Sequence, residues 1–150
     1  MSFIQEKTNG LTSLQEQYKE FWLYFNAISS QHIVFPQEFK CHPIPSIRCY
    51  QDYSIGKPYH LVVKINLTKN QIAIGAYFND VVKYDEFYRY KDNIVNSLNM
   101  ELGWIKHSTK GSAFMVLPAN LYDKSQWIII CEIIIAKMID IKKAFNSLSI

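Results

Sequence analysis

The feature that most constrains this chain is a pair of alternating segments within residues 59–79. In the first segment every second position is apolar, namely Leu61, Val63, Ile65 and Leu67. After a polar break at residues 68–70, the second segment repeats the pattern with Ile72, Ile74, Ala76 and Phe78. Because side chains alternate between the two faces of a β-strand, this pattern predicts a β-hairpin with one apolar face.

A single hairpin is marginally stable in water, so another layer must cover its apolar face. Two segments have the helical spacing that such a layer needs. The first helix begins after a cap at Thr12 or Ser13, and its predicted core stripe is Leu14, Tyr18, Phe21, Phe25 and Ile28. The last helix spans residues 124–147 after a cap at Asp123, with the stripe Trp127, Cys131, Ile134, Met138, Ile141 and Phe145.

The remaining elements complete an α+β fold. The alternation of residues 47–53, which follow a proline-rich segment, predicts an edge strand. The helical spacing of apolar residues over 84–99 predicts a third helix. Residues 100–106 and 113–117 predict two short strands around the polar loop at 107–112. The predicted order is α-β-β-β-α-β-β-α, a two-layer sandwich with an antiparallel sheet of about five strands. We expect residues 1–10 to be a loose lead-in and residues 11–150 to form a single domain.

Composition and cysteine usage favour a cytoplasmic protein. The three cysteines, Cys41, Cys49 and Cys131, have no framework spacing, so we expect free thiols. The first residues lack the basic and apolar regions of a signal peptide. The most apolar run, residues 127–141, is shorter than a bilayer span and contains charged residues, so we predict no membrane contact.

Several phrases of the sequence resemble a bacterial domain of unknown function. They are residues 18–25, residues 56–60, Lys91-Asp92-Asn93-Ile94, Glu101-Leu102-Gly103-Trp104, the loop with Lys110, and Asp123 followed by Trp127. That domain occurs alone or appended to nuclease-like modules of the PD-(D/E)XK type. The resemblance runs from about Leu11 to the end of the chain. It implies a bacterial or mobile-element context near DNA transactions or defence, and it implies no reaction.

No catalytic pattern is found in the sequence. A nuclease core needs acidic residues and a lysine that hold Mg²⁺ and activate water, and the nearest candidates are Asp52 and Lys64. Cys41, His42, Cys49 and His60 lack the close pairs of a zinc site. We therefore predict no catalytic residue, metal or cofactor, and we lean away from an enzyme. A degenerate nuclease is the third hypothesis.

Five basic residues are candidate contacts for nucleic acid or phosphate. They are Arg48, Lys64, Arg89, Lys106 and Lys110. With Tyr50 and Tyr77 they could form a basic, aromatic sheet face for single strands, and the loop at 107–112 could hold a phosphate. The alternative for the basic residues is an ordinary charged surface, which suits a net charge of only +3. The alternative for the loop is a solvated hairpin loop.

A second apolar patch lies on the polar side of the last helix. Ile129, Ile133 and Ala136 fall there, away from the predicted core stripe. Either the first helix or the proline-rich loop covers them, or they form a surface for self-association or a partner. We also expect Trp104 and Trp127 to be core residues rather than ligand platforms.

Together these observations favour a non-enzymatic interaction module of a bacterial or phage protein, acting through a protein partner or as a dimer. The alternative is a nucleic-acid-binding accessory domain of a restriction or nuclease system. Salt-dependent binding to DNA or RNA would separate the two.

Overall fold

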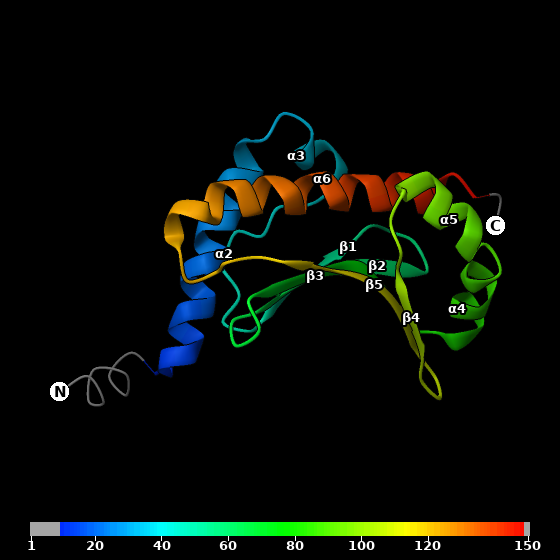
Figure 1. The fold of residues 1–150 in the computed structure, drawn as a ribbon, viewed down its shortest axis with the longest axis horizontal. Helices are drawn as coiled ribbons and strands as arrows, with labels where there is room; N and C mark the ends of the chain where they lie inside the picture. The colour runs from blue at the N-terminus through cyan, green and yellow to red at the C-terminus, as the bar shows by residue number, and fades with distance from the viewer. Residues whose placement is uncertain (1–9, 149–150) are drawn as a thin grey trace.

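The computed structural model of the chain describes residues 10–148 (Figure 1). In chain order its elements are α2 (Ser13–Gln31), α3 (Phe35–Glu38), β1 (Tyr50–Ser54), β2 (Tyr59–Asn66), β3 (Gln71–Phe78), α4 (Val81–Tyr88), α5 (Lys91–Leu98), β4 (Gly103–Lys106), β5 (Gly111–Pro118), the short 3₁₀ helix η1 (Lys124–Gln126) and α6 (Trp127–Asn146). The predicted α+β class and the order of the main elements are confirmed. The predicted lead-in lies outside the described residues except for Gly10.

The five strands form one antiparallel sheet in the order β1-β2-β3-β5-β4. The hairpin β2–β3 is in register from Tyr59 opposite Phe78 to Asn66 opposite Gln71, and β1 is an edge strand as predicted. Asn70, in the turn of the hairpin, has a positive φ of 50°. Asparagine tolerates this conformation better than most residues, which explains why it ends the polar break.

One loop covers the free edge of β1. The backbone oxygen of Cys49 accepts a hydrogen bond from the Ile65 amide, so every second residue from Cys49 onward points its backbone groups toward β2. Asp52 belongs to the other set, and its backbone groups point away from β2. His42 Nε2 donates to the backbone oxygen of Asp52 at 2.7 Å. The loop that precedes β1 therefore satisfies an outward-facing carbonyl group of the edge strand.

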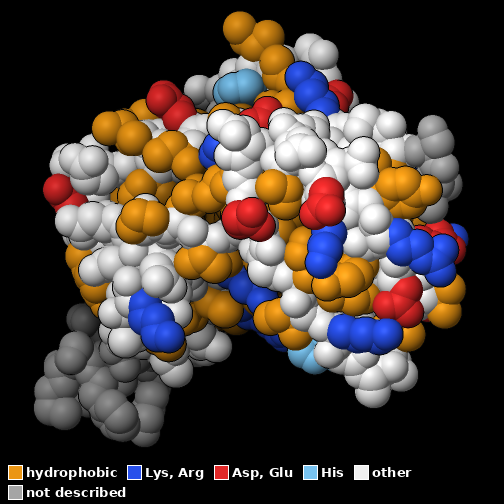
Figure 2. All heavy atoms as spheres, turned by 45° about the vertical axis from the view of Figure 1, so that its right-hand side comes forward, with side chains coloured by type: hydrophobic (Ala, Val, Ile, Leu, Met, Phe, Trp, Pro, Cys, Tyr) orange, Lys and Arg blue, Asp and Glu red, His pale blue; other side chains and the backbone are white. Residues whose placement is uncertain are grey.

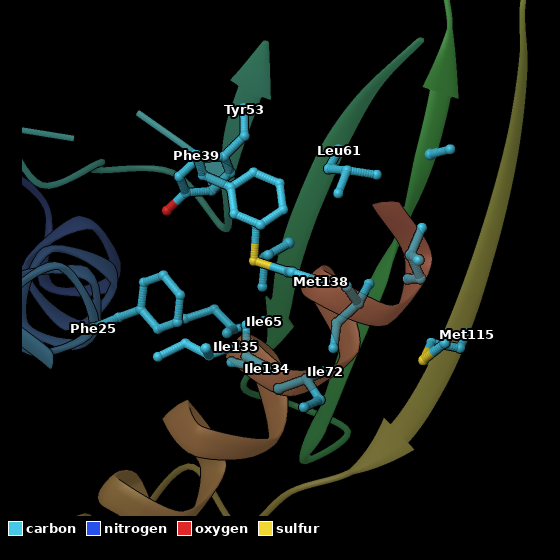
Figure 3. Close-up of a cluster of buried hydrophobic side chains, with 14 of the residues drawn as sticks. Phe25, Phe39, Tyr53, Leu61, Ile65, Ile72, Met115, Ile134, Ile135 and Met138 are labelled. Atoms are coloured by element: carbon cyan, nitrogen blue, oxygen red, sulfur yellow. The ribbon is translucent and has the colours of Figure 1, made fainter. Parts of the chain in front are cut away.

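The helices cover one face of the sheet (Figure 1). α6 runs across this face, α2 packs against α6, and α4 and α5 lie at the end of the sheet near β4. The alternating rows of the hairpin are buried as predicted, with Leu61, Val63, Ile74, Ala76 and Phe78 fully inaccessible. Figure 3 shows Ile134 and Met138 of α6 among the sheet residues of this core.

The helix α2 begins as predicted but buries a different set of residues. The Thr12 hydroxyl accepts from the Gln15 amide, and the Gln15 side chain accepts from the Thr12 amide, which confirms the predicted cap. Leu14, however, is 47% exposed, because the first turns of α2 extend past the sheet (Figure 1). Trp22 is fully buried instead, and its indole N–H donates to the backbone oxygen of Arg48 at 2.8 Å.

A buried amide pair ties α2 to the edge strand. Asn26 Nδ2 donates to Gln51 Oε1 at 3.1 Å, and Gln51 Nε2 donates to Asn26 Oδ1 at 2.8 Å. Gln51 Nε2 also donates to the hydroxyl of Tyr53 at 2.9 Å. Burial raises the pKa of Tyr53, which keeps that hydroxyl neutral at physiological pH. Because every partner in this network is satisfied, the polar groups hold α2 in one position on β1.

The single helix predicted at residues 84–99 is wrong in two respects. It begins earlier, at Val81, where the Asp80 carboxylate accepts from the Val82 amide. It is also divided into α4 and α5 by a break near Tyr90, whose amide donates to the oxygen of Phe87 at 2.9 Å, three residues back. The break lets α4 pack on the sheet while α5 packs against α6. No Gly or Pro marks it in the sequence.

The prediction of a core Trp104 is only partly correct. Trp104 is half-buried at the edge of the core, and its neighbour Ile105 is 55% exposed. The indole ring stacks on Phe145 with centroids 6.3 Å apart and meets the edges of Tyr84 and Tyr88. The strand β4 begins at Gly103, so the predicted strand at 100–106 is too long by three residues. Such a short edge strand leaves one side of the indole ring outside the core.

The last helix confirms its predicted core stripe, because all six residues of that stripe are buried. The Asp123 carboxylate accepts from the Ser125 amide, as the predicted cap requires. The first turn is a 3₁₀ helix, after which α6 begins at Trp127.

The mutation Trp127→Ala should lower the free energy of unfolding by about 3–5 kcal/mol. The indole ring is 93% buried, meets Phe21 and Tyr24 with centroids 5.2 Å and 5.6 Å away, and donates to the oxygen of Leu121 at 2.9 Å. Urea unfolding followed by circular dichroism measures the change, with the exposed Tyr122→Ala as control. An unchanged free energy of unfolding would show that this packing is wrong.

The mutation Gly75→Ala should destabilise the sheet by about 1–3 kcal/mol, because the new methyl group would overlap the backbone oxygen of Ala113 on β5. Gly103 lies in the same cross-strand row, and there the methyl group would lie 3.6 Å from the Phe114 oxygen, an ordinary contact. Thermal melts of Gly75→Ala and Gly103→Ala compare the two positions. Equal stability of both variants would contradict the observed approach of β3 to β5.

Candidate functional site

The face of the sheet opposite α6 carries no helix (Figure 1). Because the strand period is two, the residues between the core positions point to this face. We define the open sheet face by Tyr50, Asp52, His60, Val62, Lys64, Ala73, Gly75, Tyr77, Phe114 and Val116. Tyr50 lies opposite Lys64, His60 lies opposite Tyr77, and Gly75 lies opposite Phe114.

A groove runs along the open sheet face. At one end Leu14 and Tyr18 of α2 line it together with Cys49, Lys64 and Val116. Cys49 and Lys64 also line its continuation, a hollow that reaches Tyr50, Asp52, His60, Val62 and Tyr77. Figure 2 shows a hollow on the lower side of the molecule, where basic and hydrophobic side chains lie together. The overhanging first turns of α2 thus form a wall of the groove.

The five predicted basic contacts do not form one cluster. Arg48 and Lys64 lie at the open sheet face, where Arg48 Nη1 donates to the Tyr50 hydroxyl at 3.1 Å and Lys64 Nζ lies 4.6 Å from the centre of the Phe114 ring. Arg89 lies at the junction of α4 and α5. Lys106 and Lys110 belong to the β4–β5 hairpin. The fold therefore separates the five residues into two groups.

In the group away from the open sheet face, Lys106 contacts α4. Lys106 Nζ lies 3.1 Å from Asp85 Oδ1, and the Val81 amide donates to the Thr109 oxygen at 3.0 Å. The predicted phosphate loop at residues 107–112 is thus a hairpin turn, closed by the His107 amide, which donates to the Lys110 oxygen at 2.8 Å. A phosphate contact at this loop stays a prediction.

The two candidates for a nuclease centre lie on the same face but have other partners. Asp52 Oδ1 is hydrogen-bonded to His60 Nδ1 across β1 and β2, while Lys64 lies over Phe114. The His60 ring meets Tyr77 with centroids 5.3 Å apart, and its Nε2 is buried with no hydrogen-bond partner among the described residues. Within residues 10–148, His, Cys, Asp and Glu side chains do not gather in any group of three or more that could hold a metal ion.

The outer stripe of α6 is the second surface of interest. We define it by Ile129, Ile133 and Ala136, all of which are exposed, with Ile129 at 51% and Ile133 at 39%. The first helix and the proline-rich loop do not cover these residues, so that predicted alternative is wrong. Glu132 and Lys137 flank the stripe.

A family model described as "Domain of unknown function (DUF4268)" matches residues 17–149. The chain belongs to this family. No curated protein and no solved structure matches it. The predicted resemblance to a domain of unknown function is confirmed, and the match begins at residue 17 rather than at about Leu11.

No helix in the described part of this DUF4268 domain has the length and apolarity that crossing a membrane requires.

Sequence reasoning did not identify Phe114 or the pair of Asp52 and His60 in this DUF4268 domain. Phe114 appears in the sequence as one member of a short apolar run, and only the pairing of β3 with β5 places it beside Gly75 on the open sheet face. Asp52 and His60 are eight residues apart in the chain and meet through the β1–β2 register. The alternation of each strand was the available signal, but it does not say which strands are neighbours.

Alkylation should distinguish the three cysteines. Burial raises the pKa of Cys131 to about 12, with a further contribution from the nearby Glu132, so little reactive thiolate forms. Cys41 and Cys49 are only partly buried. Iodoacetamide labelling followed by mass spectrometry should modify Cys49 in the native protein and Cys131 only after unfolding. Equal native labelling of Cys49 and Cys131 would contradict this burial.

Proposed function

We propose that this protein is a non-enzymatic interaction module that acts as a dimer through the outer stripe of α6. The observation that carries the proposal is the exposure of Ile129 and Ile133 on a helix whose opposite side is fully buried. Exposed isoleucines that are neighbours on one helix are typical of a protein interface.

The residues around the stripe favour a second copy of this chain as the partner. Ile129, Ile133 and Ala136 occupy d, a and d positions of a heptad pattern, and Glu132 and Lys137 then occupy the flanking g and e positions. The next a position is Asp140, so the apolar seam is confined to these three residues. In a parallel pair of helices, a g residue faces the e residue of the next heptad on the partner. Neither Glu132 nor Lys137 has an ion-pair partner within residues 10–148. A two-fold dimer would pair each Glu132 with the Lys137 of the other copy.

The cellular setting belongs to the same proposal. We place the module in the cytoplasm of a bacterium or in a phage protein, linked to defence or DNA transactions. The resemblance to a domain that is appended to PD-(D/E)XK nuclease-like modules supports this setting, and the three free thiols agree with a reducing compartment.

The double mutation Ile129→Lys with Ile133→Glu should convert a dimeric parent into a folded monomer, because it places charges in the apolar interface. Sedimentation equilibrium measures the mass, and circular dichroism checks the fold. The matched control is Ile33→Lys with Ile44→Glu, which makes the same changes at residues that are 85% and 76% exposed and outside the stripe. A monomeric parent, or equal effects of both double variants, would overturn the proposal.

The flanking charges give a second, independent test. Glu132→Lys and Lys137→Glu should each weaken the dimer, because each places like charges opposite one another. The combination of both changes should restore the affinity, since the pairs form again with exchanged signs. If the double variant dissociates as readily as the single ones, the parallel pairing is wrong.

A further inference from the structure

The open sheet face has the composition of a site for an anionic, aromatic ligand. Two permanent cations, Arg48 and Lys64, are exposed on it. These two cations face a single carboxylate on the defined face, that of Asp52, which His60 contacts by a hydrogen bond. The local charge is therefore positive, although the net charge of the chain is only +3. Phosphate groups are the complementary charges that such a surface attracts most strongly.

The same face also offers aromatic rings at several points of its floor. Tyr50, Tyr77 and Phe114 come from β1, β3 and β5, and all three are partly exposed. Tyr77 and Phe114 are diagonal neighbours across the β3–β5 pair, because Phe114 lies opposite Gly75. Gly75 and Ala73 carry little or no side chain, so no side chain at these two positions projects beside the rings and blocks access to them. Unpaired bases stack on such rings regardless of their sequence.

Two cations and two of the rings alternate on this face, in the order Arg48, Tyr50, Lys64 and Phe114. Arg48 reaches the hydroxyl of Tyr50, and Lys64 lies between Tyr50 on one neighbouring strand and the Phe114 ring 4.6 Å from its Nζ. A strand of nucleic acid presents phosphates and bases in the same alternation. A duplex hides its bases from such rings, so the stacking platform selects a single strand.

We propose that the open sheet face binds single-stranded nucleic acid, with Arg48 and Lys64 contacting phosphates and Tyr50, Tyr77 and Phe114 stacking on bases. The wall formed by Leu14 and Tyr18 of α2 then limits the path of the strand along the groove. The open sheet face shares no residue with the outer stripe of α6, so the proposed nucleic-acid binding does not depend on the proposed dimer.

Fluorescence anisotropy tests the proposal with labelled oligothymidylate, oligouridylate and the corresponding DNA duplex. Measurements at about 50 mM and about 200 mM salt should show binding that weakens steeply with salt, as phosphate contacts require. Both single strands should bind more tightly than the duplex, and the comparison of the two shows whether DNA or RNA is preferred. No binding of either single strand at the lower salt, or equal binding of the duplex, would overturn the proposal.

Paired charge-removal variants locate the site. Arg48→Ala with Lys64→Ala should weaken single-strand binding at least about tenfold and reduce the salt slope by about two, one for each phosphate contact. Arg89→Ala with Lys110→Ala removes the same charge away from the groove and should change the affinity less than about twofold. Equal losses in the two variants would show that binding follows net charge alone and would contradict the assigned site.

The aromatic part of the site needs a variant that keeps the charge. Phe114→Leu and Tyr77→Leu should each weaken binding by at least about fivefold without changing the salt slope, because a stacked base is lost while the phosphate contacts remain. Circular dichroism and thermal melting of each variant confirm that the sheet is intact. A folded Phe114→Leu variant that binds like the parent would show that the ring does not contact the bases.

Discussion

The contact between α6 and one face of the sheet is the interaction on which the remaining structure depends. The alternating rows of β2 and β3 bury their apolar side chains only because α6 lies across them, with Ile134, Met138 and Ile141 fully buried. A sheet of this size has no other large apolar layer to use, since α2, α4 and α5 lie toward its ends (Figure 1). The sheet then has one covered face and one open face, and this asymmetry decides where a ligand can bind.

Much of this arrangement could be predicted from local patterns in the sequence. The period of two between Leu61 and Phe78 gave the hairpin, and the Thr12 cap gave the start of α2. Both signals reside in neighbouring residues. The break near Tyr90 could not be predicted in this way, because it depends on two different surfaces that α4 and α5 must reach. Neither could the exposure of Leu14, which follows from how far α2 extends beyond the sheet.

The candidate surfaces show the same division. Helical periodicity alone placed Ile129 and Ile133 on the polar side of the last helix, but only the fold shows that no other element covers them. The separation of Arg48 and Lys64 from Lys106 and Lys110 depends on strand order, which no local pattern states. Five basic residues that look equivalent in the sequence therefore have different surroundings in the fold.

The two proposed surfaces lie on opposite layers of the molecule. The outer stripe of α6 points away from the sheet, while the groove lies on the face that α6 does not touch. Dimerisation through α6 would thus leave both grooves accessible and would place two of them on one particle. Two linked sites on a continuous strand raise the effective concentration at the second site, so weak individual grooves could together hold a strand firmly.

The hydrogen bond from His42 to the backbone of Asp52 has a consequence for how this sheet meets other chains. An uncovered edge strand is a template on which a foreign strand can add, and such addition leads to aggregation. Here the loop before β1 occupies an outward-facing carbonyl group on that edge. The opposite edge is β4, which is only four residues long. One outward carbonyl group is thus occupied at the first edge and the second edge is short, and both features reduce the opportunity for strand addition.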